Sequence, residues 1–499
     1  MDAMARIRGR VRLVTLWAAL CRKGWPGCGN LALVLVVCQA CATFAPRAHA
    51  SPRTGGPAED RPWQYDVRVE PNLDLAVAGD FAGPIHATLR VDDGAAAFVR
   101  DVVVREGASE RPVVPGDAAW RIVCAARCRV RYRFKLRDAA ATLVGPDTAL
   151  ESGGVVVAPP STWLLRPDYA PAGKRYLFHV EQAAGVQFVT GVRPARSGAA
   201  NTYEAEAASL SASSFAAFGP LRTSSGKTPG MLVSIAPGLP FDDATLLSWI
   251  DSEAAAISDY FRRPPSDRVV MLVVPGTSPA TRGETLSGGG ASVLIRVGTA
   301  VTRESLQDDW VVAHELVHVA FPSLSYDDAW FTEGLASYVE PVARARSGLT
   351  TVERMWAELV QGMPQGLPGP SDTGLRGNHE WGRVYWGGTL YFLLADVEIR
   401  KSTAGARGLD DAIRAVSVGV DTEDSRAILQ VLEAGDRATG VPVLRDLYTR
   451  MAEAPGSQDL PALWASLGVE PDGKNIRFRD GAPFATIRAA ITSAPAGQR

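Results

Sequence analysis

Hydrophobic and polar residues alternate along most of the segment from Ser51 to about Pro237. The runs "YDVRVEP", "HATLRVDD", "CRVRYRFKL" and "GVQFVTGVRP" repeat with a period of two residues, and Gly, Pro or Asp separates them. This period is typical of strands with one buried face. Several short strands at close spacing predict a β-sandwich-like domain over residues 51–237.

The period changes after residue 237. Asp242 and Asp243 precede a run with apolar residues three and four apart, which predicts a capped helix ending before Pro264. The run "RVVMLVVP" predicts a buried strand, and "SGGGASVLIRVG" predicts a glycine-marked turn into another strand. One helix is expected over residues 303–320. A second is expected from Asp327 or Asp328 to about Glu340, ended or kinked by Pro341.

The rest of the chain is mostly helical in pattern, apart from a breaker-rich loop over residues 362–380. The runs "VYWGGTLYFLLADVEIR" and "VPVLRDLYTRMAEA" predict a buried and an amphipathic helix. We therefore expect an α+β multidomain protein. Its β-rich domain covers residues 51–237, a mixed domain covers 238–400, and a helical C-terminal region covers 401–499.

The first 50 residues have the features of a secretory signal peptide. Six basic residues lie between Arg6 and Lys23, the uncharged apolar run "LALVLVVCQACATFA" follows, and "AHA" ends at Ala50. This pattern predicts cleavage after Ala50 and a periplasmic or secreted protein with no stable membrane span once the leader is removed. An uncleaved membrane anchor and lipidation at Cys41 are the alternatives.

Cysteine usage and net charge narrow the class of protein. Four of the six cysteines belong to the leader, which leaves Cys124 and Cys128 in "RIVCAARCRVRYRF". In an oxidising compartment, this pair predicts a small disulfide that closes a hairpin; a metal site would require further soft ligands nearby. The formal net charge of −2 argues against a nucleic-acid binder, which would carry a basic surplus.

Candidate chemistry is concentrated in "HELVH", residues 314–318. Residues four apart lie on one face of a helix, so His314 and His318 can direct two imidazoles at one ion. Glu315 can reach a water on that ion without binding the ion itself. The alternative is an ordinary core helix whose histidines are packed and hydrogen-bonded.

A third ligand is available on the next predicted helix. A catalytic His₂Glu zinc site takes its carboxylate from another element. Glu333, in "AWFTEGLASYVE", follows His318 after fourteen intervening residues, and a short loop can bring its helix back beside the first. Glu340 lies two turns further on, as either a supporting group of the site or a structural glutamate.

Together, "HELVH" and "WFTEGLASYVE" resemble the gluzincin metallopeptidases, particularly aminopeptidase N, leukotriene-A hydrolase and the glycyl aminopeptidases. The resemblance covers mainly residues 242–400 and implies a thermolysin-like catalytic domain that binds Zn²⁺. It implies that His314, His318 and Glu333 bind the metal and that Glu315 is the general base. The interval between His318 and Glu333 is shorter than in aminopeptidase N.

The family also uses a tyrosine to stabilise the oxyanion, and the resemblance assigns this role to Tyr385 in "YWGG". A packed aromatic residue at a helix start is the alternative, and His379 is a second candidate donor. The family's strand that binds substrate corresponds to "SGGGAS", which makes Gly288, Gly289 and Gly290 candidate substrate contacts. This segment lacks the family's glutamate for the substrate amino group, and Glu284 is the nearest substitute.

These observations predict an exported zinc metallopeptidase that hydrolyses a peptide or protein substrate with a metal-activated water, and that is an aminopeptidase if the resemblance extends to specificity. A protein of another class is the alternative: a catalytically silent envelope binding or assembly protein with a retained zinc site. Hydrolysis of a small non-peptide substrate, as in the leukotriene hydrolase, is a third option.

Overall fold

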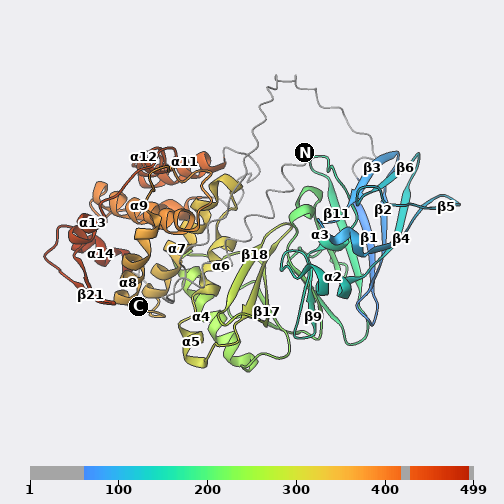
Figure 1. The fold of residues 1–499 in the computed structure, drawn as a ribbon, viewed down its shortest axis with the longest axis horizontal. Helices are drawn as coiled ribbons and strands as arrows, with labels where there is room; N and C mark the ends of the chain where they lie inside the picture. Colours follow the sequence, from blue (N-terminus) through green and yellow to red (C-terminus); the bar gives the residue numbers. More distant parts are fainter. Residues whose placement is uncertain (1–60, 417–426, 494–499) are drawn as a thin grey trace, which may run out of the picture.

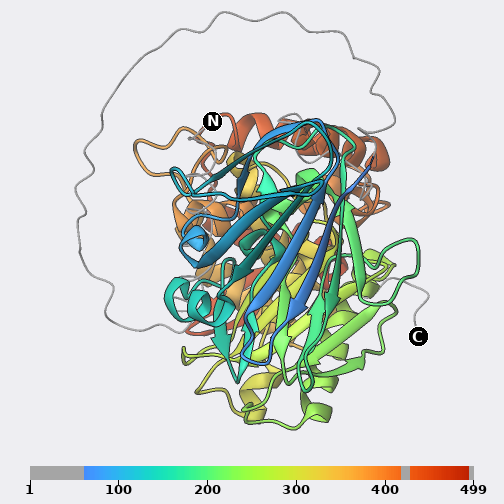
Figure 2. The ribbon, with the colours of Figure 1, turned by 90° about the vertical axis from the view of Figure 1, so that its right-hand side faces the viewer.

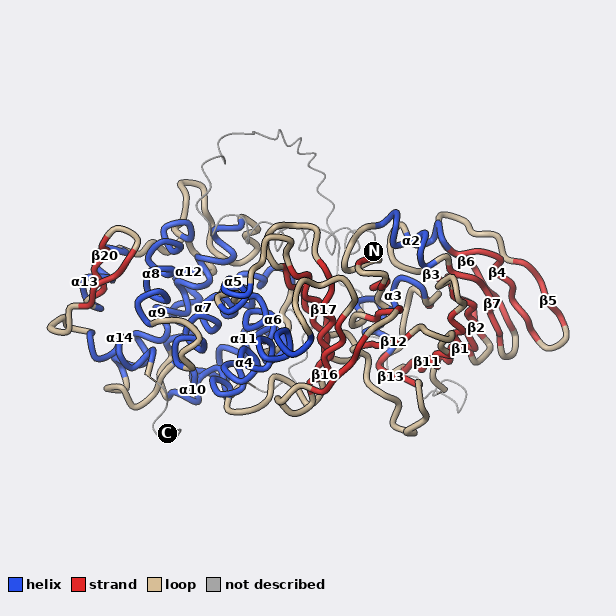
Figure 3. The backbone as a smooth tube through the Cα atoms, turned by 90° about the horizontal axis from the view of Figure 1, so that it is seen from below, coloured by secondary structure: helices blue, strands red, loops and turns tan. Residues whose placement is uncertain are grey.

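The computed structural model describes residues 61–416 and 427–493. The molecule is elongated, with strands at one end, helices at the other and a further sheet between them (Figures 1 and 3). The predicted leader, its cleavage point after Ala50 and Cys41 lie outside the described residues. Within the described ranges, no helix combines the length and the apolar character needed to cross a bilayer.

The N-terminal part consists of strands and a few short helices. Its seven-stranded sheet has the order β13-β11-β1-β2-β7-β4-β5, in which β1 and β11 are parallel. A three-stranded sheet, β10-β3-β6, and a four-stranded sheet, β12-β14-β9-β8, accompany it. The bounds of these elements are β1 (Trp63–Val69), β2 (Leu75–Phe81), β3 (Ile85–Arg90), β4 (Val99–Glu106), β5 (Ser109–Pro112), β6 (Trp120–Cys124), β7 (Cys128–Phe134), α2 (Leu136–Leu143), β8 (Leu150–Ser152), β9 (Val155–Val157), α3 (Pro160–Trp163), β10 (Arg166–Pro167), β11 (Arg175–Glu181), β12 (Gln187–Thr190), β13 (Thr202–Glu206) and β14 (Ala216–Gly219).

Alternation along these strands separates a buried face from a solvent face. In β1, Trp63, Tyr65, Val67 and Val69 are buried and the residues between them are exposed. The buried side chains of the seven-stranded sheet share one core with Leu89 of β3 and Ile122 of β6. Figure 2 views the molecule from this end and shows the long strands side by side. The period-two pattern thus gives the predicted strands and their buried sides.

Cys124 and Cys128 lie within disulfide-bonding distance of one another. The predicted hairpin is not present: β6 pairs with β3, and β7 pairs with β2 and β4. The cysteine pair therefore joins two sheets at the point where the chain passes between them. Strand pairing depends on distant partners, so the local sequence around the two cysteines did not indicate this.

A five-stranded sheet, β15-β16-β17-β19-β18, carries the central part of the molecule. Its strands are β15 (Arg222–Ser225), β16 (Met231–Ile235), β17 (Val269–Pro275), β18 (Arg282–Leu286) and β19 (Ala291–Val297). β16 and β17 are parallel neighbours, so the predicted boundary between residues 237 and 238 falls within the chain segment that forms this sheet. Among the strands of the described residues, β18 pairs with β19 alone and lies at the edge.

Helices cover one face of this sheet, while β9 of the N-terminal part packs on the other. The helices after β16 are α4 (Asp243–Phe261), α5 (Arg303–Gln307), α6 (Val311–Ala320), α7 (Ala329–Arg346), α8 (Val352–Gly362), α9 (Gly388–Ser402), α10 (Leu409–Arg414), α11 (Ala427–Thr439), α12 (Val443–Met451), α13 (Leu460–Leu467) and α14 (Ala485–Thr492), with a small hairpin of β20 (Val469–Asp472) and β21 (Asn475–Phe478). Their buried faces form one large core with Val233, Met271 and Val293 of the sheet.

Two helices of the structure have bounds that differ from the predicted ones. The expected helix over residues 303–320 is divided into α5 and α6, and the Asp309 side chain between them accepts a hydrogen bond from the Val311 amide. α7 continues through Pro341 to Arg346. A proline inside a helix costs roughly 3 kcal/mol, and the burial of Val342 and Ala343 beyond it offsets this cost.

Candidate metal centre

α6 presents both histidines to the same neighbour. The helix is apolar and buried almost throughout, so its position is determined by packing between the sheet and α7. His314 and His318 lie one turn apart, with ring centroids separated by 5.0 Å. The side chain of His314 is 4% exposed and that of His318 is 18% exposed.

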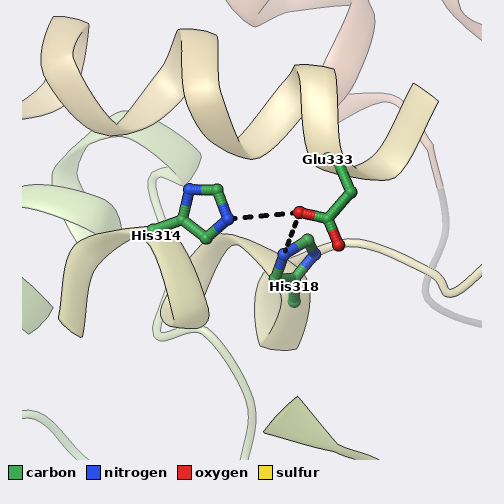
Figure 4. A group of neighbouring side chains, drawn as sticks. All are labelled: His314, His318 and Glu333. Atoms are coloured by element: carbon green, nitrogen blue, oxygen red, sulfur yellow. Dashed lines mark hydrogen bonds and ion pairs between the residues drawn. The ribbon is translucent and has the colours of Figure 1, made fainter. Parts of the chain in front are cut away.

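α7 returns beside α6 and brings Glu333 to the two imidazoles, as Figure 4 shows. Its Oε2 atom lies 3.3 Å from Nε2 of His314 and 3.5 Å from Nε2 of His318. One ligand atom from each of the three residues lies within 4.8 Å of the other two. The structure therefore brings the three predicted metal ligands together at one location.

The donor set suits zinc. Two neutral imidazoles and one carboxylate are the protein ligands of many catalytic zinc sites, which keep a fourth position for water or substrate. The Nε2 atoms of both histidines are directed at the same oxygen of Glu333. The three ligand atoms therefore already converge, and a cation bound among them would take the place of these direct contacts.

Electrostatic coupling within the trio is strong. Burial lowers the pKa of His318, but the charge and hydrogen bonding of Glu333 and the charge of Glu315 outweigh it and raise that pKa to about 8. Burial raises the pKa of Glu333, but His318 and His314 outweigh burial and hold the pKa well below its usual range. Because a metal binds the neutral imidazole, it would have to displace a proton from His318 near neutral pH.

Glu315 of α6 reaches the edge strand β18. Its Oε2 accepts a hydrogen bond of 2.8 Å from the Thr285 hydroxyl on β18. Burial raises the pKa of Glu315, although the charges of His318 and His314 and the Thr285 hydrogen bond act in the other direction. Thr285 was not among the predicted site residues, since only the pairing of β18 with the sheet places it beside α6.

Tyr385 lies near the trio, in a π-helical turn (η5, Arg383–Gly387) that leads into α9. Its ring is 6.4 Å from the His314 ring and 5.8 Å from the Trp381 ring, nearly parallel to both. Burial raises the pKa of Tyr385, and the charge of Glu333 raises it further. The phenol therefore remains protonated and can donate a hydrogen bond.

Gly288, Gly289 and Gly290 are not brought to the site. Ser214 donates to the carbonyl oxygens of Gly288 and Gly290, and the Arg193 amide donates to that of Gly289. The turn is thus bonded to the N-terminal part of the chain and does not offer these groups to a substrate. The strand exposed at the edge is β18, immediately before the turn.

A cavity of about 360 Å³ lies between the edge strand and the two helices. Its walls carry Glu315, His318 and Glu333 as the polar centre. The apolar lining includes Leu286, Val317, Phe321, Leu324 and Leu335, and Ala212 of the N-terminal part closes one side. Glu284 and Thr285 of β18 also line the cavity. Two of the three predicted ligands, His318 and Glu333, therefore open onto a cavity whose volume lies in the range of small-molecule binding sites.

Two other candidates have different surroundings. His379 stacks on Tyr326, with ring centroids 4.3 Å apart, and contacts neither predicted metal-binding histidine. Glu340 is fully buried beside Arg344, whose Nη1 lies 3.4 Å from its Oε1. Arg344 also pairs with Glu253 of α4. Glu340 therefore belongs to a buried charge cluster that joins α7 to α4.

No protein-family model and no curated protein matches this sequence. Solved structures share its fold. An aminopeptidase N family protein from Idiomarina loihiensis superimposes with a TM-score of 0.63 at 12% identity, over 82% of this chain and 78% of that chain. An M1 zinc metallopeptidase from Deinococcus radiodurans superimposes with a TM-score of 0.50 at 17% identity, over 80% and 95%.

A variant of the Deinococcus radiodurans enzyme bound to a Tyr-Ser-Ala substrate also has a TM-score of 0.50, at 16% identity and over 80% and 95% of the two chains. These identities are low, so the likeness concerns the fold. The chain has the mixed α/β multidomain fold of the aminopeptidase N-like, M1 zinc metallopeptidases. The resemblance that the two motifs indicated is confirmed at this level.

Proposed function

We propose that this protein is an exported zinc-dependent metallopeptidase that hydrolyses peptide bonds. One observation carries the proposal: the Nε2 atoms of His314 and His318 converge on one oxygen of Glu333, beside a cavity that Glu315 also lines. The shared fold supports the proposal, since the structures that superimpose on this chain include zinc metallopeptidases. The predicted leader is the basis for export.

The roles of the residues follow from their positions. His314, His318 and Glu333 would hold zinc, which supplies a Lewis acid for the attacking water and the scissile carbonyl. Glu315, tethered by Thr285, takes the proton from the attacking water and passes it to the leaving amine. Tyr385 remains protonated and donates a hydrogen bond to the developing oxyanion.

The substrate is proposed to bind as an extra strand along β18, whose outer edge is unpaired within the sheet order. The apolar lining next to Glu315 favours an apolar side chain beside the scissile bond. Whether cleavage begins at a free amino terminus depends on an anchor for that group. Glu284 belongs to the part of β18 that lines the cavity, but Gly283 and Thr285 face α6, so alternation along the strand turns the Glu284 side chain away from that helix.

The decisive experiment uses the purified mature protein with measured zinc content. A peptide library with free amino termini and its acetylated counterpart are incubated with the protein, and products are identified by mass spectrometry. Cleavage of free peptides alone would support an aminopeptidase, and cleavage of both sets an endopeptidase. No cleavage at full zinc occupancy would favour the alternative, an envelope binding or assembly protein with a retained zinc site.

Glu315→Gln is the matched control for this experiment. The substitution keeps the size of the side chain and the ligand trio, so zinc content is expected to equal that of the wild type. Hydrolysis is expected to disappear, because the amide cannot accept the proton of the attacking water. Full activity in this variant would exclude the proposed mechanism.

A further inference from the structure

The π-helical turn that carries Tyr385 is held from outside by a buried ion pair. Arg383 Nε lies 2.8 Å from Oδ2 of Asp372, and its Nη2 donates to Oδ1 at 3.2 Å. The third guanidinium nitrogen donates to the carbonyl oxygen of Gly366. Because the side chains of Arg383 and Asp372 are 3% and 4% exposed, this is a buried, two-pronged pair.

Asp372 is itself fixed in place. Its carboxylate accepts hydrogen bonds from the Gly374 amide at 2.8 Å and from the Asn378 side chain at 3.2 Å. Through Gly366 and Asp372, Arg383 therefore joins two separate points of the loop over residues 362–380 to one turn of helix. The loop forms a rigid support for that turn.

Arg383 and Tyr385 lie on opposite sides of the π-helical turn. Residues two apart along a helical turn point to nearly opposite sides. The guanidinium accordingly bonds with the loop while the Tyr385 ring lies against the His314 ring on the other side. π-helical turns are rare and are frequently found at functional sites, and the bonds of Arg383 hold this one from the side of the loop.

We propose that Arg383 and Asp372 are positioning residues that hold Tyr385 at the reaction site. This inference rests on the proposed peptidase function, in which Tyr385 stabilises the oxyanion. Neither residue reaches the ligand trio, so their effect passes through Tyr385. Removing one partner leaves the other as an uncompensated buried charge and frees the turn.

A double-mutant cycle tests whether Asp372 acts on the reaction through Tyr385. Tyr385→Phe is expected to lower kcat roughly 100-fold, the usual effect of removing one oxyanion donor. Asp372→Asn is expected to lower kcat by about 10-fold or more with a much smaller change in KM. In the Tyr385→Phe background, Asp372→Asn should lower kcat no further. Full multiplication of the two effects, or an unchanged kcat in Asp372→Asn, would overturn the proposal.

A second pair provides the control. Arg400 and Asp396 form a buried ion pair of the same Nε–Oδ distance, 2.8 Å, in the C-terminal half of α9. Asp396→Asn is expected to lower the melting temperature while leaving kcat per folded molecule unchanged. If Asp372→Asn does not fold, Arg383→Lys retains the charge without the two-pronged bond and takes its place in the cycle.

Hydrogen exchange supplies a readout that does not depend on activity. In Asp372→Asn, the amides of residues 383–389 are expected to exchange faster than in the wild type, and those amides should be unaffected by Asp396→Asn. An inactive wild type with full zinc content would refute the proposed function. The exchange rates at residues 383–389 in Asp372→Asn would still test the positioning role, and rates equal to those of the wild type would contradict that role.

Discussion

Gly334 of α7 and Gly388 of α9 lie in direct backbone contact. A Cβ atom on Gly334 would overlap the backbone of Gly388, and one on Gly388 would overlap the Trp330 carbonyl oxygen and the Gly334 backbone. The two helices therefore cross where neither has a side chain. Glu333 immediately precedes one glycine and Tyr385 precedes the other by three residues, so this crossing brings the candidate metal ligand and the candidate oxyanion donor together.

The crossing predicts the outcome of Gly334→Ala. The added methyl group must push α9 away from α7, because its neighbours are backbone atoms and cannot rotate aside. Overpacking of this kind costs about 1–3 kcal/mol or more. We expect a lower melting temperature in thermal unfolding and a lower kcat, since Tyr385 moves with α9. Gly369→Ala, where a Cβ meets no atom within 4 Å, is the control and should match the wild type.

Metal binding should depend on Glu333. Glu333→Gln removes the charged ligand from a site where both imidazoles face it. Zinc affinity is expected to fall by at least 10-fold, a typical loss even for outer-shell changes, and competition with a chelator of known affinity measures it. Glu353→Gln, on the exposed side of α8, should retain wild-type affinity. Equal affinity in both variants would show that zinc binds elsewhere.

The hydrogen bond between Thr285 and Glu315 leads to a prediction about kcat. Thr285→Val preserves shape but removes the donor that holds the Glu315 carboxylate. A hydrogen bond to a charged group contributes about 1.5–3 kcal/mol, so kcat is expected to fall by roughly 10-fold or more if most of that energy is lost in the transition state. Zinc content should not change. Thr285→Ser retains a hydroxyl and should recover most of kcat; steady-state kinetics that show no recovery would contradict this role.

Stability should depend on pH through Glu253. Burial raises the pKa of Glu253 to about 8, with Arg344 lowering it and Glu340 raising it in turn. The folded state then binds more protons than the unfolded state between pH 4.5 and 8, so the contribution of Glu253 to stability is full below pH 4.5 and is lost as pH rises towards 8. The slope is at most about 1.4 kcal/mol per pH unit.

Glu253→Gln removes this titration and provides the comparison. The difference in melting temperature between wild type and Glu253→Gln should shift against the wild type as the pH rises from 5 to 8. Groups that titrate in both proteins cancel in that difference, which thermal unfolding at several pH values measures. A difference that is constant across this range would mean that Glu253 is ionised throughout.

The candidate site divides into parts that local sequence could reveal and parts that it could not. The spacing of His314 and His318 determined that both imidazoles share one helix face, and the pattern after them indicated a second helix carrying Glu333. These features depend only on the geometry of a single element, which repeats every 3.6 residues whatever surrounds it. The same holds for the alternating strands of the N-terminal part.

Other features depended on contacts between distant segments, and only the tertiary structure decided them. The hydrogen bond from Thr285 to Glu315 spans 30 residues, and the bonds from Ser214 that bind the Gly288–Gly290 turn span more than 70. The cysteine pair was visible in the sequence, but its role as a link between two sheets was not. Periodicity shows which side of an element is buried; which segment covers that side depends on how the whole chain packs.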